Sequence, residues 1–242
     1  MATTIFETPD IESSTDDYAT RFSGGVGKWF LRKQLKATLR QIGDMRGARV
    51  LDVGGGHGQL LGGLLDAGYR VTVTGSNEGC SMRIRKLLEN DRAAFKVCPL
   101  TSLDFGDGSF DVVVSYRMLS HLERWRNFVE ELCRVSSGKV IIDYPTYRSF
   151  NALNGLLFRL KHGVEKNTRE FAIFHEADIV AEFEKHGYRQ TQRYGQYVLP
   201  MALHRAHRCQ PLAFLLEAAL RMVGLAWLFG SPVIACFEKT ES

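Results

Sequence analysis

The stretch Val50–Leu60, VLDVGGGHGQL, joins a short apolar run to a cluster of glycines. Six of the chain's 23 glycines lie between residues 54 and 63. Glycine loses more backbone entropy on folding than any other residue, so such a cluster needs a geometric reason. We interpret the stretch as a strand followed by a tight turn into a helix. In open α/β sheets, a ligand binds at the carboxyl end of such a strand.

The spacing of these glycines narrows the choice of ligand. A dinucleotide fingerprint requires G-x-G-x-x-G/A, and Gln59 or Leu61 would stand at its last position. The pattern here is G-x-G-x-G, at Gly54, Gly56 and Gly58. No Gly-Lys-Ser/Thr follows, so the turn is not a P-loop.

Outward from this turn, strand-like and helix-like segments alternate, which predicts a parallel sheet covered by helices on both faces. The patterns predict strands at 49–53, 70–74, 94–97, 110–115, 139–143, 188–198 and 232–238, and helices at 28–42, 57–67, 82–90, 122–135 and 175–186. We expect a flexible lead-in over the first 17 or so residues. We also expect a single domain over 1–242, with N-terminal cap helices at about 18–44 and lid insertions at about 145–172 and 199–229.

Composition argues for an ordinary globular chain, with 45% hydrophobic and 24% charged residues. The formal net charge of +4 is too mild to imply nucleic acid by itself. The five cysteines are widely spaced and form no CxxC, which predicts reduced thiols, most of them in the core. The N-terminus resembles no secretory signal, and the longest uncharged run, sixteen residues, is too short to span a bilayer. We expect a cytoplasmic location.

Five segments, taken in order, resemble the class I S-adenosylmethionine-dependent methyltransferases. VLDVGGGHGQL is similar to the first motif of that family, with Asp52 in its usual acidic position. The other four are LDFGDGSFDVV at 103–113, YRMLSHL at 116–122, ELCRV at 131–135 and GSPVI at 230–234. The resemblance covers roughly Tyr18 to Lys239. It implies a Rossmann-like three-layer sandwich with a seven-stranded, mostly parallel sheet whose last strand is antiparallel.

The resemblance also implies a cofactor, S-adenosylmethionine, lying over the first two strands. Tyr18 and Arg21 stand where the family often folds an N-terminal segment over the cofactor. A guanidinium suits a carboxylate, so Arg21 is a candidate partner for that group. The cofactor-binding residues implied in this way are Asp52, Gly54, Gly56, Gly58, Ser76, Leu100, Ser115, Tyr18 and Arg21.

Two positions depart from the family pattern. Gly75 stands where the second strand usually ends in an acid that holds the ribose hydroxyls, and Pro99 stands where an Asp often meets the adenine. Ser76, Asn77 or Glu78 could accept the ribose hydrogen bonds, and Leu100 could offer a backbone N–H. A hydrogen bond to a charged group is worth roughly 1.5–3 kcal/mol. Either other residues replace these contacts, or affinity is reduced, or the site is degenerate.

Methyl transfer needs an aligned acceptor and, for a hydroxyl or phenol, a base near neutral pKa. His121, which follows the fourth strand, is our candidate for that base; the alternative is a structural role in capping a helix. Strand ends line the crevice of such sheets. On this ground and by the resemblance, the candidate acceptor-facing residues are Tyr116, Arg117, Asp143, Tyr144 and His175.

The segment Pro211–Phe229 is apolar almost all round, relieved by Glu217 and Arg221. It reads as a buried lid helix or dimer face, or as a helix that contacts a membrane surface or covers a lipid-like acceptor. The loop Ser115-Tyr-Arg-Met lacks the Asn/Asp-Pro-Pro-Tyr motif of enzymes that methylate nucleic-acid amines, so a nucleic-acid acceptor is disfavoured.

We therefore expect an S-adenosylmethionine-dependent methyltransferase that uses no metal. Its acceptor would be a small molecule, apolar or lipid-like, with O-methylation favoured and S-adenosylhomocysteine as the second product. A non-catalytic relative that binds a ligand or partner through the same fold is the alternative. A nucleotide-dependent oxidoreductase is disfavoured by the spacing at Gly58 and Gln59.

Overall fold

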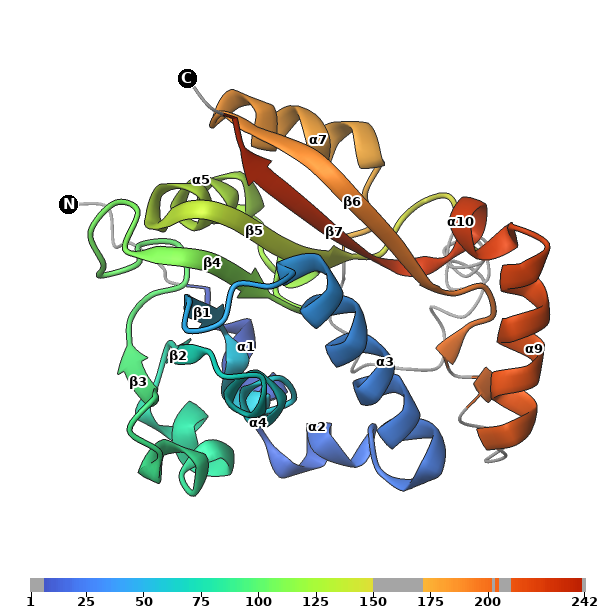
Figure 1. Ribbon diagram of the computed structural model, residues 1–242, viewed down its shortest axis with the longest axis horizontal. Coiled ribbons are helices and arrows are strands. Elements are labelled where there is room, and N and C mark those ends of the chain that lie inside the picture. Colours follow the sequence, from blue (N-terminus) through green and yellow to red (C-terminus); the bar gives the residue numbers. More distant parts are fainter. Residues whose placement is uncertain (1–6, 150–171, 202, 205–209, 241–242) are drawn as a thin grey trace, which may run out of the picture.

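The computed structural model describes residues 7–149, 172–201, 203–204 and 210–240. Its centre is a seven-stranded sheet in the order β3-β2-β1-β4-β5-β7-β6 (Figure 1). Strands β1 to β5 pair in parallel, whereas β7 is antiparallel to both β5 and β6. The predicted fold class is confirmed. The strands are β1 Arg49–Val53, β2 Arg70–Gly75, β3 Ala93–Val97, β4 Phe110–Ser115, β5 Ser136–Tyr144, β6 Tyr188–Tyr197 and β7 Ser231–Lys239.

Neighbouring residues of each central strand pack into different layers, because successive side chains of a strand point to opposite faces. In β1, Val50 joins the core beneath α3 and α4, and Leu51 joins the core beneath α5 and α7. This gives a three-layer sandwich (Figure 1). The helices are α1 Pro9–Ser13, α2 Asp16–Thr20, α3 Gly24–Ile42, α4 Leu61–Asp66, α5 Trp125–Val135, α7 Glu176–Lys185, α9 Gln210–Met222 and α10 Leu225–Phe229, with 3₁₀ turns η1 Gly55–His57, η2 Glu78–Ile84, η3 Leu87–Glu89 and η4 Leu119–His121.

Two segments predicted as α-helices have a different secondary structure. The segment 57–67 is not one helix, because Gly58 has a left-handed backbone with φ 75° and α4 begins only at Leu61. The segment 82–90 forms the 3₁₀ turns η2 and η3 instead of an α-helix. Only Cys80 and Ile84 of η2 are buried, so this segment has too small an apolar face to stabilise a regular helix.

The flexible lead-in is also wrong from residue 9 onward. Pro9 opens α1 at a position that suits proline, since its missing N–H would have no partner there. Thr15 caps α2 by accepting a hydrogen bond from the Tyr18 N–H at 3.2 Å. Asp10, in the first turn of α1, is fully buried. The N-terminal segment therefore packs on the body of the protein, against η1 and η2.

The two predicted insertions differ in how much of them the structure describes. Most of 145–172 lies outside the described residues, while α9 and α10 occupy the second part of 199–229. None of the described helices is long and apolar enough to cross a membrane. Cys80, Cys98, Cys133 and Cys236 are buried free thiols, as expected, and Cys209 lies outside the described residues.

Two glycines away from the turn, Gly195 in β6 and Gly230 after α10, let α10 approach β6 closely. A Cβ added at Gly195 would lie 2.9 Å from the Cα of Gly230 and closer still to the carbonyl oxygen of Ala226. A Cβ added at Gly62, in α4, would meet only the Leu87 side chain, at an ordinary 3.9 Å.

These contacts predict opposite effects for two identical substitutions. Gly195→Ala should lower the free energy of unfolding by about 1–3 kcal/mol, because backbone atoms must move to admit the methyl group. Gly62→Ala should raise it by about 0.5–1 kcal/mol, because alanine restricts the unfolded chain and favours the helix. Urea denaturation of the two variants measures both; a neutral Gly195→Ala would contradict the close approach.

Candidate functional site

The glycine turn after β1 has a backbone that side chains rarely tolerate. Gly54 and Gly58 are left-handed, with φ of 74° and 75°. The Gly54 N–H donates to the carbonyl of Thr74 at 3.0 Å, which ties the turn to the end of β2. A Cβ at Gly55 would collide with the Asp52 carboxyl group, and one at Gly56 with the Cys80 carbonyl. The turn therefore needs glycine at all four positions.

Several buried polar atoms around this turn have no hydrogen-bond partner among the described residues. They are Asp52 Oδ2, Thr74 Oγ1, Ser14 Oγ and both ring nitrogens of His57. Buried polar atoms in folded proteins are nearly always paired, and a cluster of exceptions marks a place where a ligand or water completes the pairing. This cluster lies at the carboxyl ends of β1 and β2, where open α/β sheets bind ligands.

Burial shifts the pKa values of both titratable groups of this cluster in the direction that favours the neutral form. Desolvation raises the pKa of Asp52 to about 7. Desolvation, together with the charges of Arg117 and Arg83, lowers the pKa of His57 to about 4. The His57 ring packs edge-on against Tyr18 and Phe22, with centroid distances of 5.6 and 5.4 Å. The turn thus offers a neutral imidazole and a carboxyl group that is partly protonated at pH 7.

Asp10 of α1 lies beside Gly75, the position at the end of β2 where the family pattern has an acid. The carboxylate of Asp10 accepts hydrogen bonds from the N–H and the Oγ of Ser76, both at 2.6 Å, and from Cys80 Sγ at 3.4 Å. Its Oδ2 is 3.3 Å from the Cβ position that a side chain at Gly75 would have. That Cβ would also lie 2.6 Å from the Cys80 Cβ, so Cys80 keeps position 75 a glycine.

The N-terminal helix also covers the glycine turn. A Cβ added at Gly54 would lie 3.6 Å from the Asp10 Cβ, and one at Gly56 would collide with Ser14 Oγ. The same glycines that would receive a ligand are thus in contact with α1 and the residue after it. A ligand on this turn must share the space with α1 or lift it.

Arg117 and Asp143 form a second polar group at the ends of β4 and β5. The Arg117 N–H donates to Asp143 Oδ1 at 2.6 Å, and its Nη2 donates to Gln34 Oε1 at 3.1 Å. The guanidinium lies 4.0 Å above the Phe22 ring, and Nη1 has no partner among the described residues. Arg117 has φ 63°, a strained value for a residue with a side chain, and such strain is concentrated at functional sites. Burial raises the pKa of Asp143 to about 6, against the opposing effect of Arg117.

Other predicted residues lie near these groups, but their side chains are buried in the protein interior. Ser115 Oγ donates to the Val53 carbonyl at 2.9 Å, so it links β4 to β1. The Tyr116 hydroxyl is 2.7 Å from Thr38 Oγ1 beneath α3, and burial raises its pKa well above 10. Tyr144 is fully buried, and its hydroxyl has no partner among the described residues. Leu100 is fully buried in the core.

The remaining predicted residues lie at the surface. Arg21 is exposed, and its Nη2 lies 4.0 Å from a carboxylate oxygen of Glu12. His121 is exposed at the end of η4. His175 precedes α7 and stacks on Tyr147 with ring centroids 4.4 Å apart. Of the predicted residues outside the turn, the structure brings together Tyr18, Arg117 and Asp143. It leaves Arg21, His121 and His175 on the surface.

Two residues of the site were missed at the sequence level. His57 stands inside the glycine motif, and a histidine among glycines was the one signal available for it. Asp10 gave no such signal, because its contact with Ser76 joins positions 66 residues apart. Among the described residues, no group of three or more His, Cys, Asp or Glu side chains is placed to hold a metal ion.

Part of the chain is similar in sequence to known methyltransferases. Residues 51–142 match the family model described as a methyltransferase domain. A demethylmenaquinone methyltransferase from Clavibacter sepedonicus is 32% identical over 109 residues, which is 44% of each chain. The matched region spans less than half the length of that curated relative.

Solved structures extend the likeness to the whole fold. The magnesium protoporphyrin IX methyltransferase from Synechocystis PCC 6803 with bound SAH has a TM-score of 0.66 at 16% identity and covers 93% of each chain. A possible histamine N-methyltransferase from Thermotoga maritima has a TM-score of 0.65 at 14% identity, covering 96% of this chain and 99% of the other. At such identities the likeness concerns the fold. The sequence match to a methyltransferase domain covers residues 51–142, which contain the glycine turn and strands β2 to β4.

Proposed function

We propose that this protein transfers a methyl group from S-adenosylmethionine to a small, apolar or lipid-like acceptor. The observation that carries the proposal is the glycine turn after β1, with its cluster of buried, unpartnered polar atoms. A ligand that bears hydroxyl, amino and carboxylate groups would satisfy such atoms. Bound there, the cofactor supplies a methyl group already activated by a positively charged sulfur.

The carboxylate of the cofactor needs a cationic partner, and Arg117 is better placed for this role than Arg21. The guanidinium of Arg117 is half-buried and has an unpartnered Nη1, whereas Arg21 is exposed and faces Glu12. A charge-assisted hydrogen bond is stronger where water is excluded. Tyr18, Phe22 and His57 would exclude water from this end of the site.

We assign the ribose-binding role of the missing acid to Asp10. Its carboxylate already lies beside Gly75, held by two hydrogen bonds from Ser76. A carboxylate can accept about four hydrogen bonds, and the Cys80 thiol makes a third, so one site on Oδ1 remains for a ribose hydroxyl. In this proposal α1 is the cover of the cofactor site and contributes a ligand-binding group to it.

For the base we propose Asp143, with His121 as the competing candidate. Asp143 is buried, lies beside Arg117 at the end of β5, and is mostly ionised at pH 7 with a pKa of about 6. A hydroxyl acceptor, the favoured O-methylation substrate, would give its proton to this carboxylate. His121 is exposed on η4, where a base would have less shelter from water.

Two observations support an apolar acceptor. The relative that matches 44% of this chain has a lipid-like quinone, demethylmenaquinone, in its name. The helices α9 and α10 also carry large exposed apolar side chains, among them Phe214 and Trp227. Such a surface suits a protein whose substrate resides in, or arrives from, an apolar phase.

Calorimetry with S-adenosylhomocysteine and with NAD tests the central proposal. We expect saturable binding of S-adenosylhomocysteine, because the G-x-G-x-G spacing and the polar atoms around it suit that ligand, and no binding of NAD. A dissociation constant of about 1 mM corresponds to a binding free energy of roughly −4 kcal/mol. If S-adenosylhomocysteine gives no heat of binding at concentrations up to about 1 mM, the proposal is overturned. Binding without turnover of any acceptor tried would favour the non-catalytic alternative.

Asp10→Asn tests the replacement of the missing acid. The variant should bind S-adenosylhomocysteine about tenfold or more weakly, since a hydrogen bond to a charged group is worth roughly 1.5–3 kcal/mol. Asp17→Asn, which removes the same charge from an exposed position in α2, should bind like the parent protein. Tighter binding by Asp10→Asn would instead mean that α1 only blocks the site.

The base proposal predicts a pH dependence. The kcat/KM of the parent protein should rise as pH increases through about 6 and then level off, because Asp143 accepts a proton only when ionised. Asp143→Asn, which can still accept the Arg117 N–H, should lose about a hundredfold or more in turnover and should not show this rise. A loss of turnover in His121→Ala at unchanged S-adenosylhomocysteine affinity, with none in Asp143→Asn, would return the role to His121.

A further inference from the structure

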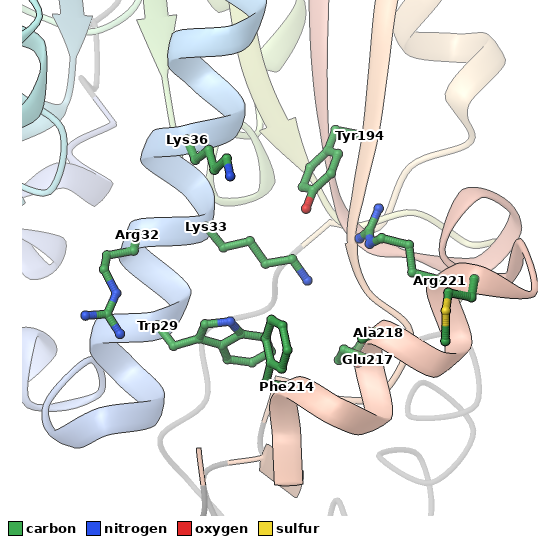
Figure 2. A pocket seen from close by; sticks show the side chains of 10 residues that line it. Trp29, Arg32, Lys33, Lys36, Tyr194, Phe214, Glu217, Ala218 and Arg221 are labelled. Carbon is green, nitrogen blue, oxygen red and sulfur yellow. The ribbon is translucent and has the colours of Figure 1, made fainter. Parts of the chain in front are cut away.

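A groove of about 530 Å³ lies between α3, β6 and α9, on the far side of α3 from the candidate cofactor site. Adjacent residues of α3 face the two sites: Gln34 contacts Arg117, while Lys33 lines the groove. Figure 2 shows Lys33 and Lys36 pointing from α3 toward the gap, with Arg221 of α9 on the opposite wall. The groove is thus distinct from the glycine turn and open to its own ligand.

Positive charge dominates the groove. Its lining holds Arg32, Lys33, Lys36 and Arg221, against the single acid Glu217. Figure 2 shows that the guanidinium of Arg32 points from α3 away from the gap, so Arg32 adds its charge at the rim of the groove. Neither Arg32 nor Lys36 makes an ion pair with any described residue, and both are exposed. Lys28 and Arg40 continue the same exposed row at intervals of four residues along α3.

Glu217 is committed to other partners. Its carboxylate is 1% exposed and accepts hydrogen bonds from the N–H groups of Val198 and Leu199 at 3.0–3.1 Å. It also lies 2.9 Å from His204 Nε2. These bonds fasten α9 to the end of β6. The acid therefore serves the chain itself and leaves most of the positive charge of the groove without an anion.

Two of the cations converge on one backbone oxygen. Lys33 Nζ donates to the Gln196 carbonyl at 2.8 Å, and Arg221 Nη2 donates to the same carbonyl at 3.0 Å. Burial and the charge of Arg221 lower the pKa of Lys33 to about 8. Arg221 Nη2 also donates to the Gly195 carbonyl at 2.7 Å, and Lys33 Nζ lies 4.4 Å from the centroid of the Tyr197 ring. None of these partners carries a negative charge, so an anion at this point would relieve the repulsion between the two cations.

The groove continues into an exposed apolar surface. Phe214 and Met222 line it and are nevertheless 54% and 82% exposed, and Trp227 of α10 is 69% exposed. Leu212, Leu215, Leu216, Val223, Leu228 and Phe229 are large exposed apolar side chains of the same segment. Aromatic and aliphatic side chains next to a row of lysine and arginine are the composition by which protein segments bind anionic membrane surfaces.

We propose that this groove binds the anionic headgroup of a membrane phospholipid, while the apolar side chains of α9 and α10 enter the acyl region beside it. The cations of α3 and α9 supply the charge complementarity, and Phe214 and Met222 connect the headgroup position to the apolar surface. The protein would dock on the bilayer through this face. This inference goes beyond methyl transfer and holds whether or not the glycine turn binds S-adenosylmethionine.

Vesicle co-sedimentation tests the proposal on the full chain. The protein should bind vesicles that contain phosphatidylglycerol more tightly than vesicles of phosphatidylcholine alone, and added salt should weaken that binding. Arg32→Gln with Lys36→Gln should weaken it roughly twenty-five-fold, at about fivefold for each charge removed. The matched control is Arg85→Gln with Lys86→Gln, which removes two exposed charges near the β3 edge of the sheet and should bind like the parent protein.

Separate measurements test the role of the apolar surface and the identity of the anion. Trp227→Ser should weaken binding to the same phosphatidylglycerol vesicles while leaving urea denaturation unchanged, because the side chain is largely exposed. Equal binding to both kinds of vesicle, or an equal loss in the Arg85 and Lys86 control, would overturn the proposal. So would displacement from vesicles by inorganic phosphate at matching phosphate concentration, which would assign the groove to a free anion. A stable dimer that shields Trp227 from a soluble quencher would assign the apolar face to a second copy.

Discussion

The backbone of the turn between β1 and α4 must be left-handed at Gly54 and Gly58, and most of the candidate site follows from this constraint. A turn without side chains lets neighbouring segments approach closely, so Asp52 and His57 are enclosed and lose water. Desolvation then moves their pKa values in opposite directions, and both changes favour the neutral form. The turn becomes a surface of dipoles and unpartnered polar atoms, and Asp52 is only partly ionised at pH 7.

Charge enters the site from segments that the sequence keeps far apart. Asp10 belongs to α1, Arg117 follows β4, and Asp143 is the last residue but one of β5. These groups bring both signs of charge to the surroundings of the turn. The helix α3 separates them from the second, strongly cationic region around Lys33 and Arg221. One helix thus forms a wall between two electrostatically different sites.

The strands and the glycine turn could be predicted because apolar, β-branched runs and clustered glycines are local signals. The bounds of β1 and β4 follow directly from RVLDV and FDVVVS. Burial is not a local signal. The segment 82–90 has helical periodicity but too few buried side chains, and the flexible appearance of MATTIFETPDIESS hides a residue as enclosed as Asp10. Likewise, nothing in YRMLSHL tells that the Tyr116 hydroxyl turns inward to Thr38.

The sheet order has a consequence for the synthesis of the chain. Among the described strands, β6 pairs only with β7, and the 33 residues from 198 to 230 separate them. On the ribosome, β6 therefore waits a few seconds for its partner, at about 5–20 residues per second. Its sequence, YRQTQRYGQY, contains no Val, Ile or Leu and carries two arginines. Charged and polar side chains on an unpaired strand discourage pairing with other chains. The composition of β6 thus suits a strand that must stay soluble while the nascent chain is completed.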